Sequence, residues 1–280
     1  MANAPTKPTT TAKQEKSSST SGMFATLTVP LCIIVSALIY FFILGHPSHF
    51  KGGDNTGEPA EGDVFGIVYK GGILVPLVMS YVLMVIVFSI ERFIVIGKAS
   101  GTASIDAFVR KIQGFLTAGN IDAASAECDK QKGSVANVIK AGLKKYKEME
   151  AETTLDTDQK TLAIQKDIEE ATALEMPMLE QNLTIIATLV AIGTLTGLLG
   201  TVFGMIGAFQ NLAKSGAASQ TALSANISEA LVNTALGIST SAISIVMYNV
   251  FTSKIDKLTY AIDETGFSIV QTFAASHKSK

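Results

Sequence analysis

The sequence predicts an all-α integral membrane protein with four transmembrane helices and long helices that extend into a cytoplasmic helical region. Three observations indicate this fold class. Of the 280 residues, 48% are hydrophobic and only 16% are charged, with a mean hydropathy of +0.36, whereas about a quarter of a soluble domain is charged. The deficit is uneven, because residues 17–50, 71–90, 181–213 and 230–253 contain no Asp, Glu, Lys or Arg. No stretch shows the apolar–polar alternation of a half-buried strand.

The N-terminal part predicts a disordered cytoplasmic tail at 1–22, a transmembrane helix at 24–44 and a Gly-rich, acidic periplasmic loop at 45–72. About 20 apolar residues suffice to cross a bilayer. A cleaved signal peptide is the alternative for the first helix, but the apolar run is long and no small-x-small cleavage pattern follows it. His46 and His49 are expected to be solvated loop residues, because a zinc site needs a closer cluster.

The second transmembrane helix is expected at 73–96, where Glu91 and Arg92 lie near its end and can be tolerated at an interface or in a bundle interior. Residues 97–180 predict a cytoplasmic helical region, with Asn120 as the cap of a helix that starts at Ile121. Its last helix is expected to run into the third span, with a bend at Pro177. The remaining expected segments are a transmembrane helix at 183–212, a periplasmic loop at 213–225, a transmembrane helix at 226–253 and a cytoplasmic tail at 254–280.

Charge determines the expected orientation and excludes several functions. Lys and Arg gather in the N-terminal tail and after the second and fourth spans, whereas loop 45–72 is acidic, which places both termini in the cytoplasm. A formal net charge of −2 leaves no basic surface for nucleic acid. The acids of residues 158–180 are expected to form a solvated face or inter-subunit ion pairs. Since no span holds a nucleophile–base pair or a metal cluster, the sequence predicts no enzyme activity, no cofactor and no metal.

The third span carries a stripe of glycines at intervals of three or four residues, which share one side of a helix. Small residues let helix backbones approach closely in lipid, where packing replaces the hydrophobic effect. We therefore expect a helix-packing face made of Gly193, Gly197, Gly200, Gly204 and Gly207.

Hydroxyl side chains form a row in each of the last two spans. Each hydroxyl in hydrocarbon needs a partner, which the i−4 carbonyl of its own helix can supply. Two facing rows favour a polar lining of an ion path over purely local bonding, and both interpretations stay open. The candidate lining residues are Thr194, Thr201, Thr234, Ser241 and Ser244.

Glu229 is the carboxylate at the start of the fourth span. It fits the third helical position after an Asn226 cap, or else an acid at the outer mouth of a cation path. The spans have no Asp, Glu, His or Lys at their centres. Because hydroxyls do not titrate near neutral pH, a proton path built here would need an ionisable carrier from another chain.

Two long motifs, GLLGTVFGMIGAF at 197–209 and ISEALVNTALGI at 227–238, followed by YNVF at 248–251, closely resemble the ExbB/TolQ/MotA proton-channel family. The resemblance covers residues from about Gly71 onward and is nearest to ExbB, so the helix at 24–44 is an addition to the three family helices. It implies a stator subunit of the bacterial inner membrane, a homopentamer around a pore that holds an ExbD-like single-span partner with the titrating Asp, and a TonB-like periplasmic effector.

Carried over by position, the resemblance places Thr201 and Thr234 on the family's pore-lining threonines and Glu229 on its pore-mouth acid. Two family prolines are replaced here, by Thr194 and by Ile243, which leaves helix bends and the coupling ion, proton or sodium, open. The alternatives are a TolQ-like envelope-integrity subunit, a motility stator, and a cation channel or scaffold without energy transduction.

Overall fold

The computed structural model describes residues 18–215 and 220–277. The described chain is almost entirely helical and contains no β-strand, and four of its helices are long and apolar enough to cross a membrane. This confirms the predicted fold class. Of the expected segments, residues 1–17 of the tail, residues 216–219 of the second loop and residues 278–280 lie outside the described residues.

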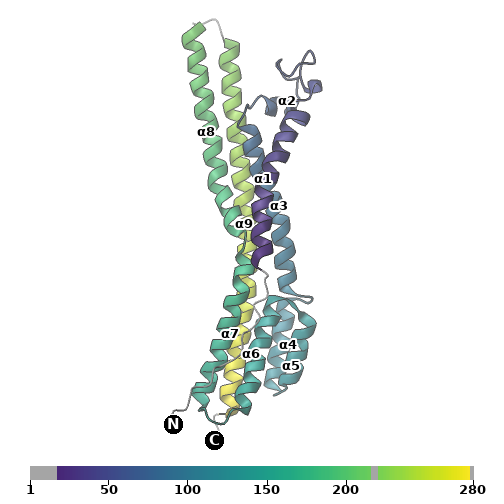
Figure 1. The fold of residues 1–280 in the computed structure, drawn as a ribbon, viewed down its shortest axis with the longest axis vertical. Helices are drawn as coiled ribbons and strands as arrows, with labels where there is room; N and C mark the ends of the chain where they lie inside the picture. The colour runs from purple at the N-terminus through teal and green to yellow at the C-terminus, as the bar shows by residue number, and fades with distance from the viewer. Residues whose placement is uncertain (1–17, 216–219, 278–280) are drawn as a thin grey trace, which may run out of the picture.

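The helices form one elongated molecule, with the start of α7 and the C-terminal end of α9 at one end, and the C-terminal end of α8 and the start of α9 at the other (Figure 1). In chain order the elements are α1 (Ser18–Leu38) with a π-helical continuation η1 (Ile39–Leu44), a 3-10 turn η2 (Pro47–His49), α2 (Val64–Tyr69), α3 (Val75–Ser100), α4 (Ile105–Thr117), α5 (Ile121–Gln131), α6 (Gly133–Ala151), α7 (Thr157–Glu180), α8 (Leu183–Ser215) and α9 (Gln220–His277).

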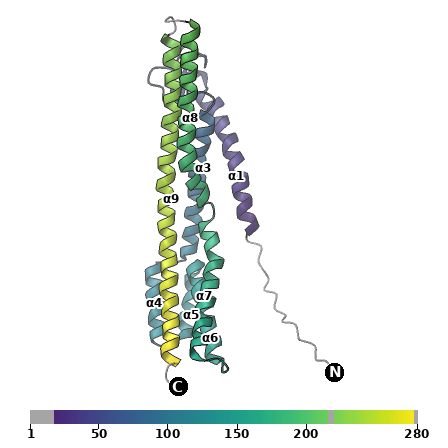
Figure 2. The ribbon, with the colours of Figure 1, turned by 90° about the vertical axis from the view of Figure 1, so that its left-hand side faces the viewer.

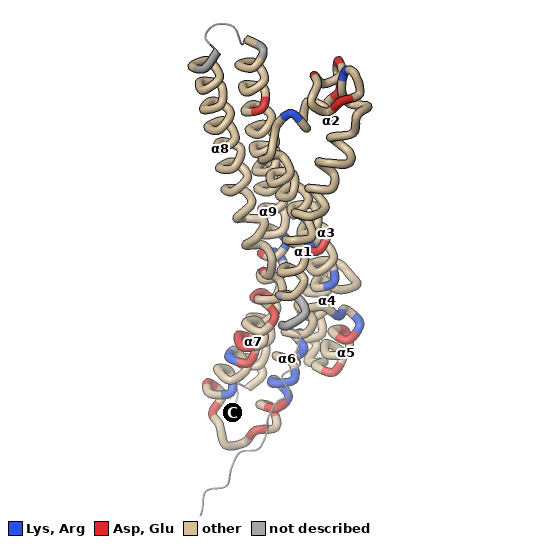
Figure 3. Tube along the Cα trace, turned by 45° about the horizontal axis from the view of Figure 1, so that its top comes forward, with Lys and Arg blue, Asp and Glu red and all other residues tan. Residues whose placement is uncertain are grey.

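Helix α9 is 58 residues long and runs along almost the whole molecule (Figure 2). Residues 254–277, expected as a tail, continue this helix and pack against α4, α6 and α7. We call α4–α7 together with residues 254–277 the charged body, and α8 together with residues 220–253 the membrane hairpin. Figure 3 shows that charged residues are frequent along the charged body and near α2, whereas the described part of α8 is almost free of them.

The charged body has a conventional apolar core. Its largest fully buried side chains include Phe108, Ile112, Ile139, Leu143 and Phe273. In α4 the apolar residues Ile105, Phe108, Val109, Ile112, Phe115 and Leu116 recur at the spacing of one helical face, and all of them are buried except Phe115, which is half-buried. Burying such side chains stabilises a fold by about 1.5–3 kcal/mol each, so this region is held together by hydrophobic burial.

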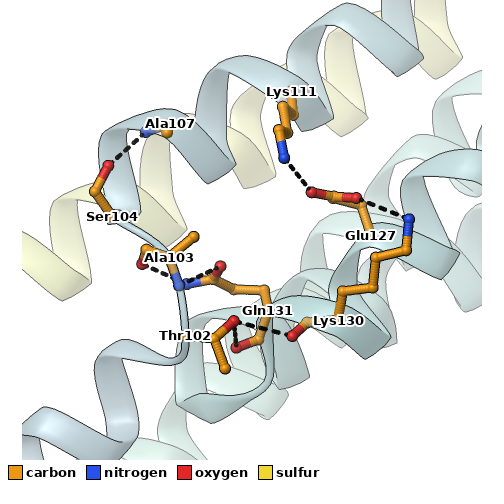
Figure 4. Close-up of polar contacts among 8 residues, drawn as sticks. All are labelled: Thr102, Ala103, Ser104, Ala107, Lys111, Glu127, Lys130 and Gln131. Carbon is orange, nitrogen blue, oxygen red and sulfur yellow. Dashed lines mark hydrogen bonds and ion pairs between the residues drawn. The ribbon is translucent and has the colours of Figure 1, made fainter.

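Side-chain caps and one buried amide define helix ends in the charged body, and Figure 4 shows the Ser104 cap of α4 and the Gln131 amide. Asn120 caps α5 by accepting a hydrogen bond from the Ala123 N–H at 2.9 Å, as the sequence predicts. The Gln131 amide donates to the carbonyls of Ser100 and Ala103, both at 2.9 Å, and therefore fixes the turn between α3 and α4 to the end of α5.

Helix α1 packs on α3 and stands apart from α8 (Figure 2). The Ser36 hydroxyl donates to the Pro76 carbonyl at 2.5 Å, and the Tyr40 and Tyr69 rings stack with centroids 4.7 Å apart. In the following loop, Nδ1 of His49 lies 2.7 Å from a carboxylate oxygen of Asp63. This hydrogen bond lowers the pKa of Asp63, whose carboxylate also accepts from the first N–H groups of α2.

The connection between α7 and α8 differs from the expected bend. Helix α7 runs through Pro177 to Glu180, and the direction changes at Gln181 and Asn182, where Asn182 has φ +63°. Asparagine tolerates this left-handed conformation better than most residues. A proline in the last turn removes only one helical hydrogen bond, so the break occurs where the left-handed residue stands rather than at Pro177.

Candidate functional site

The membrane hairpin is built around a backbone contact between α8 and α9. A Cβ added to Gly237 of α9 would lie 2.5 Å from the Gly193 carbonyl oxygen and 2.8 Å from the Gly197 Cα. Real Cβ atoms do not approach backbone atoms so closely, so glycine is needed on both helices for this separation. The contact lies in the middle of both apolar runs.

All five glycines of the predicted packing stripe face α9. Gly193 and Gly197 oppose Gly237, Gly200 opposes the Asn233 side chain, and Gly204 opposes Ala230. Gly207 lies near the Asn226 amide, with an added Cβ 3.3 Å from its oxygen. The stripe therefore forms one continuous face of α8 against α9.

Three of the predicted lining hydroxyls join the two helices. The Thr194 hydroxyl donates to Oγ of Ser241 at 2.8 Å, and Oγ of Ser241 lies 2.7 Å from the Val190 carbonyl oxygen. The Thr234 hydroxyl donates to the Gly197 carbonyl at 3.0 Å. These contacts place Thr194, Thr234 and Ser241 in one seam next to Gly193, Gly197 and Gly237.

The other two hydroxyls bond within their own helices. Thr201 is partly exposed and donates to the Leu198 carbonyl at 2.6 Å. Ser244 is fully buried inside the chain and donates to the Thr240 carbonyl at 2.8 Å. Local bonding thus accounts for Thr201 and Ser244, whereas the hydroxyls of Thr194, Thr234 and Ser241 connect helices, and the lining role of all five remains a prediction.

Glu229 lies where α9 meets the loop that precedes α3. Helix α9 already begins at Gln220, so Asn226 lies within the helix and does not act as its cap. The Glu229 carboxylate packs against Gly72, where an added Cβ would lie 2.0 Å from Oε1, and no described ion pair includes it. A cavity of about 560 Å³ opens beside it, lined also by Asn226, Ser228, Lys70 and Thr56.

Asn233 is a further polar residue of the site that sequence reasoning did not select. Its side chain is 1% exposed and its amide donates to the Gly71 carbonyl at 2.6 Å and to the Glu229 carbonyl at 3.0 Å. Its Oδ1 has no partner among the described residues. The sequence did contain a signal for this residue, because Asn233 is an amide next to Thr234 within a charge-free stretch. A buried polar group in such a stretch needs hydrogen-bonding partners.

The fold and the site define a class: a multi-span helical membrane protein whose last two spans form a glycine-packed, hydroxyl-bonded hairpin. The sequence model of the MotA/TolQ/ExbB proton channel family matches residues 130–264, which include α6, α7, α8 and most of α9. Over these residues the chain is similar to members of this family.

Three relatives illustrate the similarity. The Tol-Pal system protein TolQ of Pseudomonas aeruginosa is 24% identical over 200 residues, which cover 70% of this chain and 85% of that protein. A putative biopolymer transport protein, ExbB-like 3, of Synechocystis is 35% identical over 88 residues, 31% of this chain and 42% of the relative. The biopolymer transport protein ExbB of Xanthomonas campestris is 31% identical over 102 residues, 36% of this chain and 40% of that protein.

Proposed function

We propose that this chain is an ExbB-like stator subunit of an inner-membrane motor that couples proton-motive force to TonB-dependent outer-membrane transport. The observation that carries the proposal is a hydroxyl-bonded hairpin in a region that matches a proton channel family, with no Asp, Glu, His, Lys or Arg between residues 181 and 213 or between residues 230 and 253. Hydroxyls and amides hydrogen-bond but do not titrate near neutral pH. The titrating carboxylate therefore has to come from a partner.

The surface of the hairpin supports an assembly of several copies around such a partner. Large apolar side chains of α8 and α9 remain exposed in the single chain, among them Leu195, Val202, Phe209 and Leu231. We infer a homopentamer around a central ExbD-like subunit that carries a single Asp, with a TonB-like effector in the periplasm. Both termini and the charged body lie in the cytoplasm in this assignment, and the chain has no enzymatic role.

The test is replacement of the two threonines at the family's lining positions, Thr201→Ala and Thr234→Ala, in a strain that depends on this chain. We expect TonB-dependent uptake of an iron–siderophore complex to fall at least about tenfold while protein amounts stay normal, because a broken polar path costs more than one hydrogen bond. Repeating uptake in sodium-free buffer separates proton from sodium coupling.

Ser239→Ala is the matched control. Its hydroxyl is exposed and donates only to the Ala235 carbonyl of its own helix at 2.8 Å, so uptake should be unchanged. Unchanged uptake in both threonine variants would favour a scaffold or a channel without transduction. Failure to co-purify with a single-span, Asp-bearing protein from a neighbouring gene would end the stator proposal.

A TolQ-like role in envelope integrity is the second candidate. It is favoured by the alignment with TolQ of Pseudomonas aeruginosa, which extends over 70% of this chain. A deletion strain that becomes sensitive to detergent while siderophore uptake stays normal would select this role. A loss of surface motility alone would instead select a motility stator.

A further inference from the structure

A buried ion pair lies where α7 ends and α8 begins. The Arg92 side chain is 1% exposed, and its guanidinium bonds both carboxylate oxygens of Glu91, with Nε to Oε2 at 2.6 Å. Nη1 of Arg92 also donates to the carbonyls of Met178 and Leu179, at 3.2 and 3.1 Å. One α3 side chain therefore reaches the last turn of α7, more than 80 positions away in the sequence.

Arg92 contacts the helix end of opposite polarity, and Glu91 contacts the side chain of the residue before the next helix. The last carbonyls of a helix lack partners within it and carry partial negative charge, whereas the first N–H groups carry partial positive charge. Arg92 satisfies two such carbonyls of α7. Glu91 accepts a hydrogen bond from the side-chain amide of Asn182, the residue that precedes α8, at 3.4 Å. The pair thus bridges the break between the two helices.

The break between α7 and α8 is held by α3 on one side and borders a cavity on the other. On the side of α3, Arg92 and Glu91 hold Met178, Leu179 and Asn182. On the side of α9 there is a cavity of about 450 Å³, lined by Glu180, Thr184, Tyr248, Thr252 and Asp256 among others. Packing is incomplete there, so at the break itself the angle between α7 and α8 depends on the ion pair, whereas away from the break both helices pack on α9.

We propose that Arg92 and Glu91 are positioning residues that fix the direction of α8 relative to α7, so that a displacement of the membrane hairpin is transmitted to the charged body as a rigid movement. The first part of this inference, the geometric half, is that the pair fixes the direction of α8 relative to α7, and it concerns the chain itself. The second part, the transmission half, is that a movement of the membrane hairpin reaches the charged body, and it rests on the proposed stator function. In this arrangement the pair also affects how Thr194 of α8 meets Ser241 of α9, since that contact depends on the direction of α8.

The geometric half is tested by the distance between spin labels on α7 and α8 of the full-length protein in nanodiscs. Cysteines at Leu174 and Leu195, whose side chains are 82% and 63% exposed, carry the labels. Cys32 and Cys128 are replaced by Ala, and labelled chains are diluted into an excess of unlabelled chains so that only pairs within one chain are measured. We expect one narrow distance distribution in this background.

Glu91→Gln, Arg92→Gln and Arg92→Lys should broaden the distribution at least about twofold. Lysine should show the smallest change, because it keeps the charge and loses the forked donors. Asn182→Gly, which removes the amide contact with Glu91 and frees the backbone at the break, should broaden the distribution as well. Arg110→Gln on the exposed face of α4 is the control for loss of an arginine, and it should keep the narrow distribution.

An unchanged distribution in folded Glu91→Gln and Arg92→Lys protein would overturn the inference, even where Arg92→Gln fails to fold. Broadened distances with undiminished siderophore uptake would overturn the transmission half. Uptake that falls in proportion to the broadening, with Arg92→Lys intermediate, supports it. Failure of the proposed stator function has a different outcome: the unmodified chain forms no complex with a partner and supports no uptake. The label distances would still report the geometry of the break between α7 and α8.

Discussion

The two ends of α9 pack against their neighbours in different ways. In the membrane hairpin its buried residues, apart from Phe251 close to the charged body, are small or polar: Ala230, Asn233, Gly237, Thr240, Ser241 and Ser244. In the charged body most of its buried residues are large and apolar, namely Ile255, Leu258, Ile262, Ile269 and Phe273, and they lie beside the smaller Ala261, Thr265 and Gly266. One uninterrupted helix therefore changes its packing residues along its length.

The difference follows from the surroundings of each half. In water, burial of large apolar side chains is itself favourable and supplies most of the stability. In lipid, the surroundings are as apolar as the side chains, so helices associate through close backbone contact and internal hydrogen bonds. The change in the packing residues along α9 thus indicates where the helix leaves the membrane.

The largest expected effect is in the charged body. Phe273→Ala removes a fully buried ring that contacts Tyr146, with centroids 4.9 Å apart, and His277, with centroids 4.2 Å apart. We expect a loss of about 3–5 kcal/mol in the free energy of unfolding of this region. Hydrogen exchange should show faster exchange in α6 and in residues 254–277, with unchanged protection in α8. Equal loss of protection in both regions would show that they unfold as one unit.

Gly237→Ala tests the membrane hairpin. The new methyl group would meet the backbone of Gly193 and Gly197, and such overpacking costs about 1–3 kcal/mol. Thermal unfolding in detergent should detect the loss, and α8 should lose protection while the charged body keeps it. Gly97→Ala in α3 is the control, since an added Cβ meets nothing within 4 Å there. Equal melting temperatures for the two variants would contradict close packing as the basis of this hairpin.

Ser241→Ala should have a smaller effect in the same place. It removes the acceptor of Thr194 and the contact with the Val190 carbonyl. Hydrogen bonds between membrane helices contribute about 0.6 kcal/mol on average and up to about 1.7 kcal/mol, so a loss within this range is expected in the same unfolding assay. A double-mutant cycle with Thr194→Val measures the coupling, and a coupling of zero would show that the two hydroxyls act independently.

The smallest expected effect concerns surface charge in the charged body. A hydrogen bond from Lys111 at 2.7 Å, aided by Lys130, lowers the pKa of Glu127. Because the folded-state pKa lies below the unfolded value, the stabilisation is present above the unfolded pKa, near 4.5, and disappears as pH falls through the folded value. Such exposed pairs contribute about 0.2–1 kcal/mol. Glu127→Gln should therefore lower stability at pH 7 and have no effect at pH 3, and an equal effect at both values would exclude the ion pair as its cause.

The sequence predicts the features that depend on neighbouring positions. The four apolar runs, the helical face of α4, the Asn120 cap and the glycine stripe all repeat or adjoin within a few residues, so local periodicity reveals them. The two late motifs likewise indicated the family. The bend expected at Pro177 was misplaced because the strongest local signal, a proline, is tolerated there and the left-handed Asn182 gives a weaker one.

Contacts between residues far apart in the chain were decided by the tertiary structure alone. Arg92 reaches Leu179, Asn233 reaches Gly71, and Glu229 packs on Gly72, although no local pattern indicates any of these pairs. The sequence by itself determined which segments are apolar enough to cross a membrane, because the cost of burying charge in lipid acts on each residue of a helix separately. Which polar groups satisfy one another depends on how helices assemble, because a buried donor takes its acceptor from whichever helix lies beside it.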